Sequence, residues 1–272
     1  MAARMRLEDR TAIVTGAASG LGRAVAVSLA RRGCHLALVD VNRAGLADTA
    51  ARVAPQGVRA SQNLVDVANP EAIAALPEVV LAEHRRVDIL INNAGVALGG
   101  AFEEVSEADF EWLFAINFWG VVRMTRAFLP LLHASDDARI VNLSSVLGLI
   151  AAPRQVAYCA SKFAVRGFSE ALRQELAGST VAVTVVHPGG IATSISENAR
   201  VPKGAAPEEI ARRREEMRKV LVMPPEKAGE IIVDGIERRV PRILVGSDAK
   251  LLSTIQRLAP VSYPAVLGWL GR

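Results

Sequence analysis

Cysteine is nearly absent from this sequence, and so are long apolar runs. Cys34 and Cys159 are the two cysteines in 272 residues, too few for a disulfide framework, so we expect a reducing, cytoplasmic location with both thiols buried. No stretch approaches the roughly 18 consecutive apolar residues of a membrane-spanning helix. The opening residues MAARMRLEDR also lack the apolar core of a signal peptide. From these absences we expect that the chain has no transmembrane segment and is not secreted.

Lysine and tyrosine are scarce as well. Five of the 32 basic residues are lysines, and Tyr158 and Tyr263 are the two tyrosines, so the formal net charge of +4 comes from arginine spread along the chain. The run Arg212–Arg214 is followed at once by Glu215 and Glu216, a mixture of signs that is typical of a solvated helix face. We therefore expect no nucleic-acid partner, and we predict no metal site.

The composition that remains is that of a folded α/β protein. Hydrophobic residues make up 51% of the chain and charged residues 22%, which is enough apolar material for a large core. Short β-rich runs alternate with longer helical patterns, and several runs, such as AIVT and LALV, are apolar throughout, as expected for parallel strands covered on both faces. We predict a doubly wound, seven-stranded parallel sheet with helices on both faces. Its strands are expected at Thr11–Thr15, His35–Asp40, Arg59–Val65, Asp88–Asn92, Arg139–Ser144, Val181–His187 and Arg242–Val245.

Helical periodicity occupies the segments between these runs. The predicted helices are Leu21–Arg32, Arg43–Val53, Pro70–Glu83, Ser106–His133, Val156–Ala177 and Glu226–Arg238. Ser106 followed by Asp109 resembles a capping box at the start of the longest of them. No repeat, low-complexity tract or linker divides the chain, so we expect one domain over residues 1–272. The apolar tail at about 247–272 is expected to pack on the body or on a neighbouring subunit, with peripheral contact to a membrane as the alternative.

A glycine-rich turn follows the first predicted strand. The Gly-x3-Gly-x-Gly pattern at Gly16–Gly22 precedes a helix, and glycine lets backbone N–H groups and the positive end of the helix dipole approach a pyrophosphate. A turn into a helix also needs glycine for steric reasons alone. Asp40 ends the next strand, where a carboxylate can accept hydrogen bonds from an adenosine ribose and would repel a 2′-phosphate. The pattern predicts a dinucleotide site that favours NAD over NADP, since Ser19 brings no positive charge, although Arg43 argues the other way.

Tyr158 and Lys162 are four residues apart on a predicted helix, so their side chains share one face. A fixed ammonium near a phenol favours the phenolate and lowers the pKa of the phenol from its usual value of about 10. Such a phenol can act as a general acid or base. An ordinary surface pair at this spacing is the alternative interpretation.

Two further polar positions are candidates for the same site. Ser145 lies at the end of the run IVNLSS, where a hydroxyl projects beyond the carboxyl edge of the sheet, and Ser144 competes for this place because alternation lets one of the two face the site. Asn117 lies inside a predicted helix, where asparagine is locally unfavourable. With Gly120 close behind, it suggests a local helix distortion or a bound water, and a plain buried amide is the alternative.

Taken together, these residues resemble the short-chain dehydrogenase/reductase family in its single-domain form, over roughly Asp9 to Val245. The family's elements occur here in family order, including the segment Asn92–Gly95 that steadies its central sheet. The resemblance implies a Rossmann-like fold with the catalytic residues Asn117, Ser145, Tyr158 and Lys162. The cofactor-binding residues that it implies are Gly16, Ser19, Gly20, Leu21, Gly22, Asp40, Asp66, Val67, Asn93, Ala94, Gly95, Tyr158, Lys162, Pro188, Gly189, Ile191 and Thr193.

The resemblance also implies a reaction, hydride transfer between a nicotinamide and a carbon that bears a hydroxyl or carbonyl group. Ser145 would bind the substrate oxygen and Tyr158 would exchange a proton with it. Lys162 would bind the nicotinamide ribose and lower the pKa of the tyrosine, while Asn117 would hold a water that relays protons. The cofactor carries the difficult chemistry, and the protein supplies orientation and electrostatics.

Substrate choice is expected to depend on an insertion at about 190–225. Within it, Pro207 to Met223 has helical period and predicts a lid, with an apolar side formed by Ile210, Met217, Val220 and Leu221. A packed surface helix is the alternative. The residues expected to line the pocket are Val96, Leu147, Leu149, Ala152 and Ile191, with Arg154 as the one charged neighbour. This lining favours a small-molecule alcohol or ketone that is hydrophobic, either steroid-like or lipid-like.

Two other functions remain open on the sequence alone. An NADP-linked carbonyl reductase is the first, and it depends on whether Asp40 faces the ribose. A non-catalytic dinucleotide-binding regulator is the second, and it is disfavoured because Tyr158 and Lys162 are both present. A homodimer or homotetramer, paired through the helices that carry Asn117 and Tyr158, is implied by the resemblance.

Overall fold

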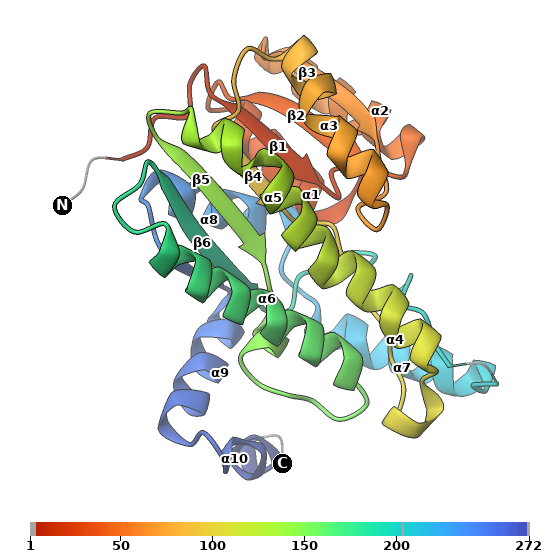
Figure 1. The fold of residues 1–272 in the computed structure, drawn as a ribbon. Coiled ribbons are helices and arrows are strands. Elements are labelled where there is room, and N and C mark those ends of the chain that lie inside the picture. Colours follow the sequence, from red (N-terminus) through yellow and green to blue (C-terminus); the bar gives the residue numbers. More distant parts are fainter. Residues whose placement is uncertain (1–3, 203, 271–272) are drawn as a thin grey trace.

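A computed structural model describes residues 4–202 and 204–270, and in this part of the chain the predicted strands form one sheet (Figure 1). All seven are parallel, in the order β3-β2-β1-β4-β5-β6-β7. The sheet winds one way from β1 to β3 and the other way from β4 to β7, so it is doubly wound and Rossmann-like. The strands are β1 (Thr11–Thr15), β2 (His35–Asp40), β3 (Ala60–Leu64), β4 (Ile89–Asn92), β5 (Ala138–Leu143), β6 (Val181–Pro188) and β7 (Arg242–Val245).

The helices alternate with the strands as predicted. They are α1 (Gly20–Ala30), α2 (Arg43–Val53), α3 (Pro70–Glu83), α4 (Glu107–Phe114), α5 (Gly120–His133), α6 (Val156–Glu175), α7 (Pro207–Val220), α8 (Pro225–Glu237), α9 (Ser247–Leu258) and α10 (Tyr263–Leu270). Shorter helical turns are η1 (Ala54–Gln56), η2 (Phe102–Glu104), η3 (Ala115–Trp119) and η4 (Val146–Gly148). The bounds of β1, β2, β7, α2 and α3 are those predicted, and the other predicted strands differ by one residue at one or both ends.

Both faces of the sheet are covered, which explains the uninterrupted apolar runs. Ala12 and Val14 of β1 belong to a core formed with α1 and α8, whereas Ile13 between them belongs to the core formed with α3 and α5. Side chains of a strand alternate between its faces, so a strand buried on both sides must be apolar at successive positions. In Figure 1, α3, α5 and α6 lie in front of the sheet and α1 and α8 behind it. Cys34 and Cys159 are buried free thiols, as expected.

The prediction of one continuous helix over Ser106–His133 is wrong in the middle of this range. Ser106 caps α4 by accepting a hydrogen bond from the backbone N–H of Asp109, but the helix then widens into a π-helical turn, η3, before α5 begins. Asn117 lies in this turn and is fully buried. Its side chain pairs with the backbone of Val96, accepting from the N–H at 2.8 Å and donating to the carbonyl at 3.0 Å. The distortion that Asn117 suggested is confirmed, and tertiary hydrogen bonds account for it.

The C-terminal tail forms two helices. α9 packs against β7 and η4, and α10 packs against α9, so the two helices extend from one end of the molecule (Figure 1). Among the described residues, no helix is long and apolar enough to cross a membrane.

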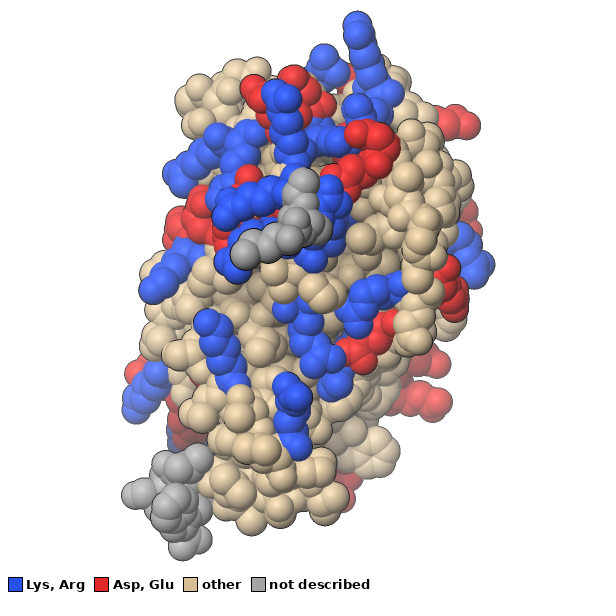
Figure 2. All heavy atoms as spheres, turned by 90° about the vertical axis from the view of Figure 1, so that its left-hand side faces the viewer, with Lys and Arg blue, Asp and Glu red and all other residues tan. Residues whose placement is uncertain are grey.

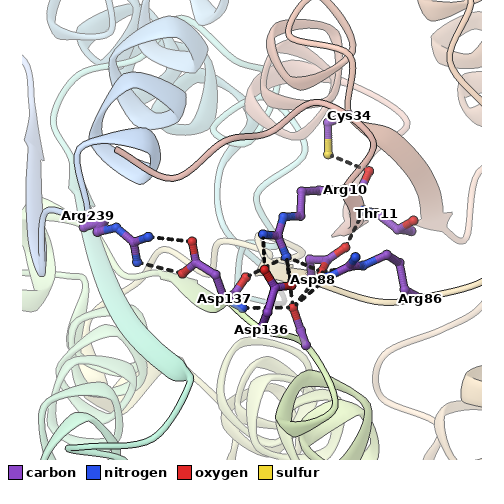
Figure 3. A network of polar contacts seen from close by, with 9 residues as sticks. Arg10, Thr11, Cys34, Arg86, Asp88, Asp136, Asp137 and Arg239 are labelled. Atoms are coloured by element: carbon purple, nitrogen blue, oxygen red, sulfur yellow. Dashed lines mark hydrogen bonds and ion pairs between the residues drawn. The ribbon is translucent and has the colours of Figure 1, made fainter. Parts of the chain in front are cut away.

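A polar network ties the amino-terminal edge of the sheet together (Figure 3). Its centre is Asp88, whose side chain is fully buried at the start of β4. The carboxylate accepts hydrogen bonds from the backbone N–H of Thr11 at 2.9 Å and from the Arg10 guanidinium at 2.9 Å. Arg86 Nε at 2.8 Å and the Ser135 hydroxyl at 2.6 Å complete the set. The network thus joins β1, β4 and the loop before β5.

Because Asp88 lies at the centre of this network, we expect its removal to lower the stability of the fold substantially. Asp88→Ala should lower the free energy of unfolding by about 3 kcal/mol or more, because the Thr11 N–H loses its acceptor and the half-buried Arg10 loses the buried one of its two carboxylate partners. Urea denaturation measures the loss. Asp136→Ala is the matched control, since Asp136 contacts the same two arginines at the surface and should cost much less. Equal losses for the two variants would contradict this account.

Candidate active site

A cavity of about 1610 Å³ lies at the carboxyl ends of the central strands and is bordered by α7. Ligands of doubly wound sheets bind at this edge, where the winding reverses between β1 and β4. Most of the predicted site residues line it, namely Gly16, Ser19, Gly20, Leu21, Gly22, Asp40, Asn93, Ala94, Gly95, Ser145, Tyr158, Lys162, Pro188, Gly189, Ile191 and Thr193. Asp66, Val67 and Asn117 are not among the lining residues.

The glycine turn after β1 has no room for side chains. Gly16 has φ +66° and Gly20 has φ +51°, in the left-handed region that favours glycine. A Cβ on Gly16 would lie 2.8 Å from Asn93 Nδ2, and one on Gly22 would overlap the carbonyl oxygen of Gly16. The steric interpretation of these glycines is therefore confirmed, and ligand binding by the turn stays a prediction.

Hydrogen bonds fix this turn to the end of β4. The Thr15 hydroxyl accepts from the backbone N–H groups of Asn93 and Ala94 at 2.9 and 3.0 Å. The Asn93 side chain donates to the carbonyl oxygens of Thr15 and Gly16 at 2.9 and 3.2 Å. The segment that was expected to steady the central sheet thus joins β1 to β4.

Asp40 lies at the end of β2 with its carboxylate held in place. Its two oxygens accept hydrogen bonds from the backbone N–H groups of Ala18 at 3.0 Å and Asn42 at 2.9 Å. The negative charge therefore borders the cavity beside the glycine turn. Arg43 is exposed and does not line the cavity.

Asp66 and Val67 lie outside the cavity wall. Asp66 is exposed and accepts a hydrogen bond from the backbone N–H of Ala68 at 2.8 Å. Val67 is buried against Gly120, where a Cβ would lie 3.1 Å from it. Their contact with an adenine ring stays a prediction.

Tyr158 and Lys162 share one face of α6, as their spacing predicts. The Lys162 ammonium lies 5.6 Å from the centre of the Tyr158 ring and donates to the Leu143 carbonyl at 3.1 Å. Ser144 is buried, and its hydroxyl donates to the Lys162 carbonyl at 2.8 Å. The neighbouring hydroxyl of Ser145 is the one that interacts with the Tyr158 side chain. The structure thus favours Ser145 over Ser144.

Burial governs the pKa values of this group. It raises the pKa of Tyr158 to about 12, against a lowering by the hydrogen bond with Ser145. It also lowers the pKa of Lys162 to about 8. In the chain by itself, the pKa of the tyrosine therefore lies above its ordinary value, opposite to the predicted direction. The loss of hydration of the phenol outweighs its hydrogen bond with Ser145.

Asn117 stands behind the cavity wall rather than in it. Besides Val96, its side chain donates to the Ser161 hydroxyl at 3.2 Å, which in turn donates to the Tyr158 carbonyl at 2.8 Å. A Cβ on Gly95 would lie 3.2 Å from Asn117 Oδ1 and 3.4 Å from Lys162 Nζ. Asn117 therefore holds the loop after β4 against α6, and the water that it was expected to bind stays a prediction.

Two residues near the site were missed in the sequence. His187 is fully buried, with Nδ1 2.9 Å from the Ser145 carbonyl, and Asp248 accepts the backbone N–H of Gly190 at 2.6 Å. His187 could have been found from the sequence, because it is a histidine just before Pro188 in an otherwise apolar strand. Asp248 gave a weaker indication, as an acid in the first turn of a helix.

The outer part of the cavity is formed by the segment 190–225. Val96, Leu147, Ala152, Ile191 and Arg154 line the cavity as expected, and so do Ile210, Met217, Val220 and Leu221 on or just after α7. The expectation that Arg154 is the one charged neighbour is wrong, because the loop before α4 and the polar side of α7 add Glu103, Glu104, Glu209, Arg212, Arg213, Arg214 and Glu216 to the lining. Leu149 does not: it follows the η4 turn and is buried instead. Arg154 forms ion pairs with Glu104 at 2.7 Å and with Glu209 of α7 at 3.7 Å, which connects α7 to the loop before α6.

The model of the short chain dehydrogenase family matches residues 10–203, and the chain belongs to the short-chain dehydrogenase/reductase family. It is an oxidoreductase of this family. The oxidoreductase SadH of Mycobacterium tuberculosis is 43% identical over 258 residues, 94% of this chain and 93% of SadH. D-threitol dehydrogenase of Mycolicibacterium smegmatis is 37% identical over 194 residues, 71% of this chain and 75% of that enzyme. The structure of a short chain dehydrogenase/reductase from Burkholderia phymatum in complex with NAD has a TM-score of 0.84 and 28% identity, covering 93% of this chain and 94% of that one.

His187 predicts how stability depends on pH. Its contact with the Ser145 carbonyl requires a proton on Nδ1, and within the described residues Nε2 has no hydrogen-bond partner. Burial lowers the pKa of His187 from 6.5 to about 4, so between these values the unfolded chain binds a proton that the folded chain does not. Stability should therefore fall as the pH falls from about 6.5 to about 4, by on the order of 3 kcal/mol.

The measurement is the Tm of three proteins across this pH range. His187→Asn keeps a donor for the Ser145 carbonyl but does not titrate, so its Tm should vary less with pH. The exposed His133 provides the control, and His133→Asn should keep the wild-type dependence. A His187→Asn profile parallel to that of the wild type would show that this histidine is not the titrating group.

Proposed function

We propose that the chain is an NAD-dependent oxidoreductase that transfers hydride between nicotinamide and a secondary alcohol or its ketone. The observation that carries the proposal is the meeting of Ser145, Tyr158 and Lys162 in one cavity with the glycine turn. The substrate is a hydrophobic small molecule, steroid-like or lipid-like. The chain acts as one domain over residues 1–272 in the cytoplasm.

The cavity suits a dinucleotide. The bare backbone at Gly16 and Gly20 fits a pyrophosphate, and the fixed carboxylate of Asp40 fits a ribose with free hydroxyls. Backbone groups from Pro188 to Thr193 would hold the nicotinamide end, which supplies the hydride acceptor when bound. The relative from Burkholderia phymatum was solved with NAD, which supports this choice.

The chain's own groups handle the proton. Ser145 would hydrogen-bond the substrate oxygen and place it against the Tyr158 hydroxyl. With a pKa of about 12, Tyr158 is protonated at neutral pH and would donate to a carbonyl oxygen during reduction. For oxidation Tyr158 must first release its own proton to solvent. Its phenolate, stabilised by the charge of Lys162 with a pKa of about 8, would then accept the proton of the substrate hydroxyl. Asn117 would support the route from Lys162 to solvent through a water.

The substrate part of the cavity is mainly apolar. Val96, Leu147 and Ala152 line it together with Met217 and Val220 of α7, although charged side chains such as Glu209 and Arg213 of α7 border the same cavity. Because α7 is held by the ion pair of Arg154 with Glu209, the helix would act as a lid over a bound alcohol. A screen of secondary alcohols of increasing chain length, followed by NADH absorbance, tests this. A preference for short polyols would contradict the hydrophobic substrate.

An NADP-linked carbonyl reductase is the second candidate. Arg43 lies three residues after Asp40 and is the one observation in its favour. A non-catalytic regulator has less support, because Tyr158 and Lys162 are both in place. We also propose a homodimer or homotetramer through α5 and α6, since Trp119 before α5 and Phe163 on α6 are exposed.

Tyr158→Phe tests the acid/base assignment. The variant should lower turnover by about 100-fold or more, because the proton loses its carrier, while NAD binding stays nearly unchanged. Tyr263→Phe, which alters the other tyrosine, is the control and should keep the wild-type rate. Turnover near that of the wild type in the Tyr158→Phe variant would show that the assignment is wrong.

Asp40→Asn tests the cofactor choice. Removing the charge should raise the affinity for NADP relative to NAD by about tenfold or more, since a carboxylate repels a 2′-phosphate at short range. Calorimetric titration of both dinucleotides gives the ratio, and Arg43→Ala should leave it unchanged. If the wild-type chain already bound NADP more tightly than NAD, the proposal of an NAD enzyme would fail.

A further inference from the structure

The two C-terminal helices combine positive charge with exposed apolar side chains. From residue 249 to residue 270 the charged residues are Lys250 and Arg257, and from residue 258 to residue 270 the sequence LAPVSYPAVLGWL carries no charge. The nearest acid, Asp248, accepts the backbone N–H of Gly190 and so serves the loop after β6. The segment is therefore basic and apolar at once.

The structure leaves both the charged and several of the apolar side chains of this segment exposed. Leu251 is 56% exposed, Leu258 82% and Val261 89%, although they are large apolar side chains. Lys250 and Arg257 are exposed beside them, seven residues or about two turns apart on α9. We call these five residues the C-terminal surface. Figure 2 shows the side of the molecule from which α9 extends, and its lower part is mostly tan, whereas blue and red side chains crowd the upper part.

The inner side of the same helices is anchored to the body. Ala249 and Ser253 of α9 are buried, and the backbone N–H of Ala151 donates to the Tyr263 hydroxyl at 2.8 Å. Leu252 of α9 lines the cavity. The C-terminal surface is therefore held firmly next to the substrate site.

The charge pattern distinguishes between candidate occupants. A second copy of the chain would meet this surface by two-fold symmetry, which presents a patch to the same patch of its partner. Lys250 and Arg257 would then be buried against the apolar side chains or the cations of the same patch, with no acid in 249–270 to pair with them. An anionic lipid surface satisfies both features, because its headgroups attract the cations and its acyl boundary accepts the apolar side chains.

We propose that the C-terminal surface docks on anionic phospholipid bilayers, with α9 and α10 lying in the plane of the headgroups. Docking itself does not depend on the proposed function. Its consequence does: the cavity beside Leu252 would then take a lipid-like alcohol or ketone directly from the membrane.

Vesicle flotation of the full chain tests the proposal. The wild-type protein should float with phosphatidylglycerol/phosphatidylcholine vesicles, less so at high salt, and should not float with phosphatidylcholine alone. The charge reversal Lys250→Glu with Arg257→Glu should weaken this binding by about tenfold or more. The pair Leu258→Glu with Val261→Glu should abolish it. Val79→Glu, at an exposed apolar position of α3, is the matched control and should float like the wild type.

Three results would overturn the proposal. The wild-type protein fails to bind anionic vesicles, or all the variants bind as well as the wild type does. In the third, no protein binds to the vesicles, and light scattering shows that the Leu258→Glu with Val261→Glu pair dissociates an oligomer. This result would make a second copy of the chain the occupant of the C-terminal surface. Turnover of a water-soluble secondary alcohol with NAD is measured on the same samples. If the proposed function is wrong, the protein binds the vesicles but shows no turnover of the alcohol. If the docking proposal is wrong, the protein shows turnover but does not bind the vesicles.

Discussion

The joint between β1 and β4 at the carboxyl edge of the sheet is the constraint on which the rest of the site depends. Thr15 and Asn93 hold the two strand ends together through both backbone and side-chain hydrogen bonds. The sheet winds in opposite directions from this pair of strands, so the joint sits where no crossover connection covers the edge. It fixes the glycine turn on one side and, through Gly95 and Val96, the contact with Asn117 on the other.

Much of the fold could be predicted because the physical signal lies in the strands themselves. Strands such as β1 and β2 are buried on both faces, so their apolar runs mark them and their ends. Asn42 and Asn69 cap α2 and α3 with their side chains, which places the starts of those helices in the local sequence. The π-helical turn could be predicted only in part. Asn117 suggested a distortion of the helix, but the form of the distortion depends on the contact of Asn117 with Val96, which precedes Asn117 by 21 residues.

In the candidate site, too, features set by the local sequence could be predicted, and features set by contacts in the folded chain could not. Tyr158 and Lys162 are fixed by helical spacing, so their meeting could be predicted. Strand alternation left Ser144 and Ser145 open, and the family resemblance chose Ser145; the structure gives the physical reason, because the Ser144 hydroxyl donates to the Lys162 carbonyl. His187 and Asp248 act on backbone atoms that are neighbours only in the folded chain. The direction of the tyrosine pKa also escaped prediction, because it depends on how completely the folded chain removes water from the phenol.

The π-helical turn before α5 also sets the rotation of that helix. Met124, Phe128 and Leu132 form the side of α5 that is buried against the sheet. Since successive residues are about 100° apart around a helix axis, a chain shorter by one residue between Ala115 and Trp119 would turn this stripe more than a quarter of the way out of the core. A substitution in the segment acts on the contacts of one side chain, but a single insertion or deletion changes the phase of everything that follows. As related chains diverge, the length of this turn should therefore stay constant even where residues other than Asn117 vary.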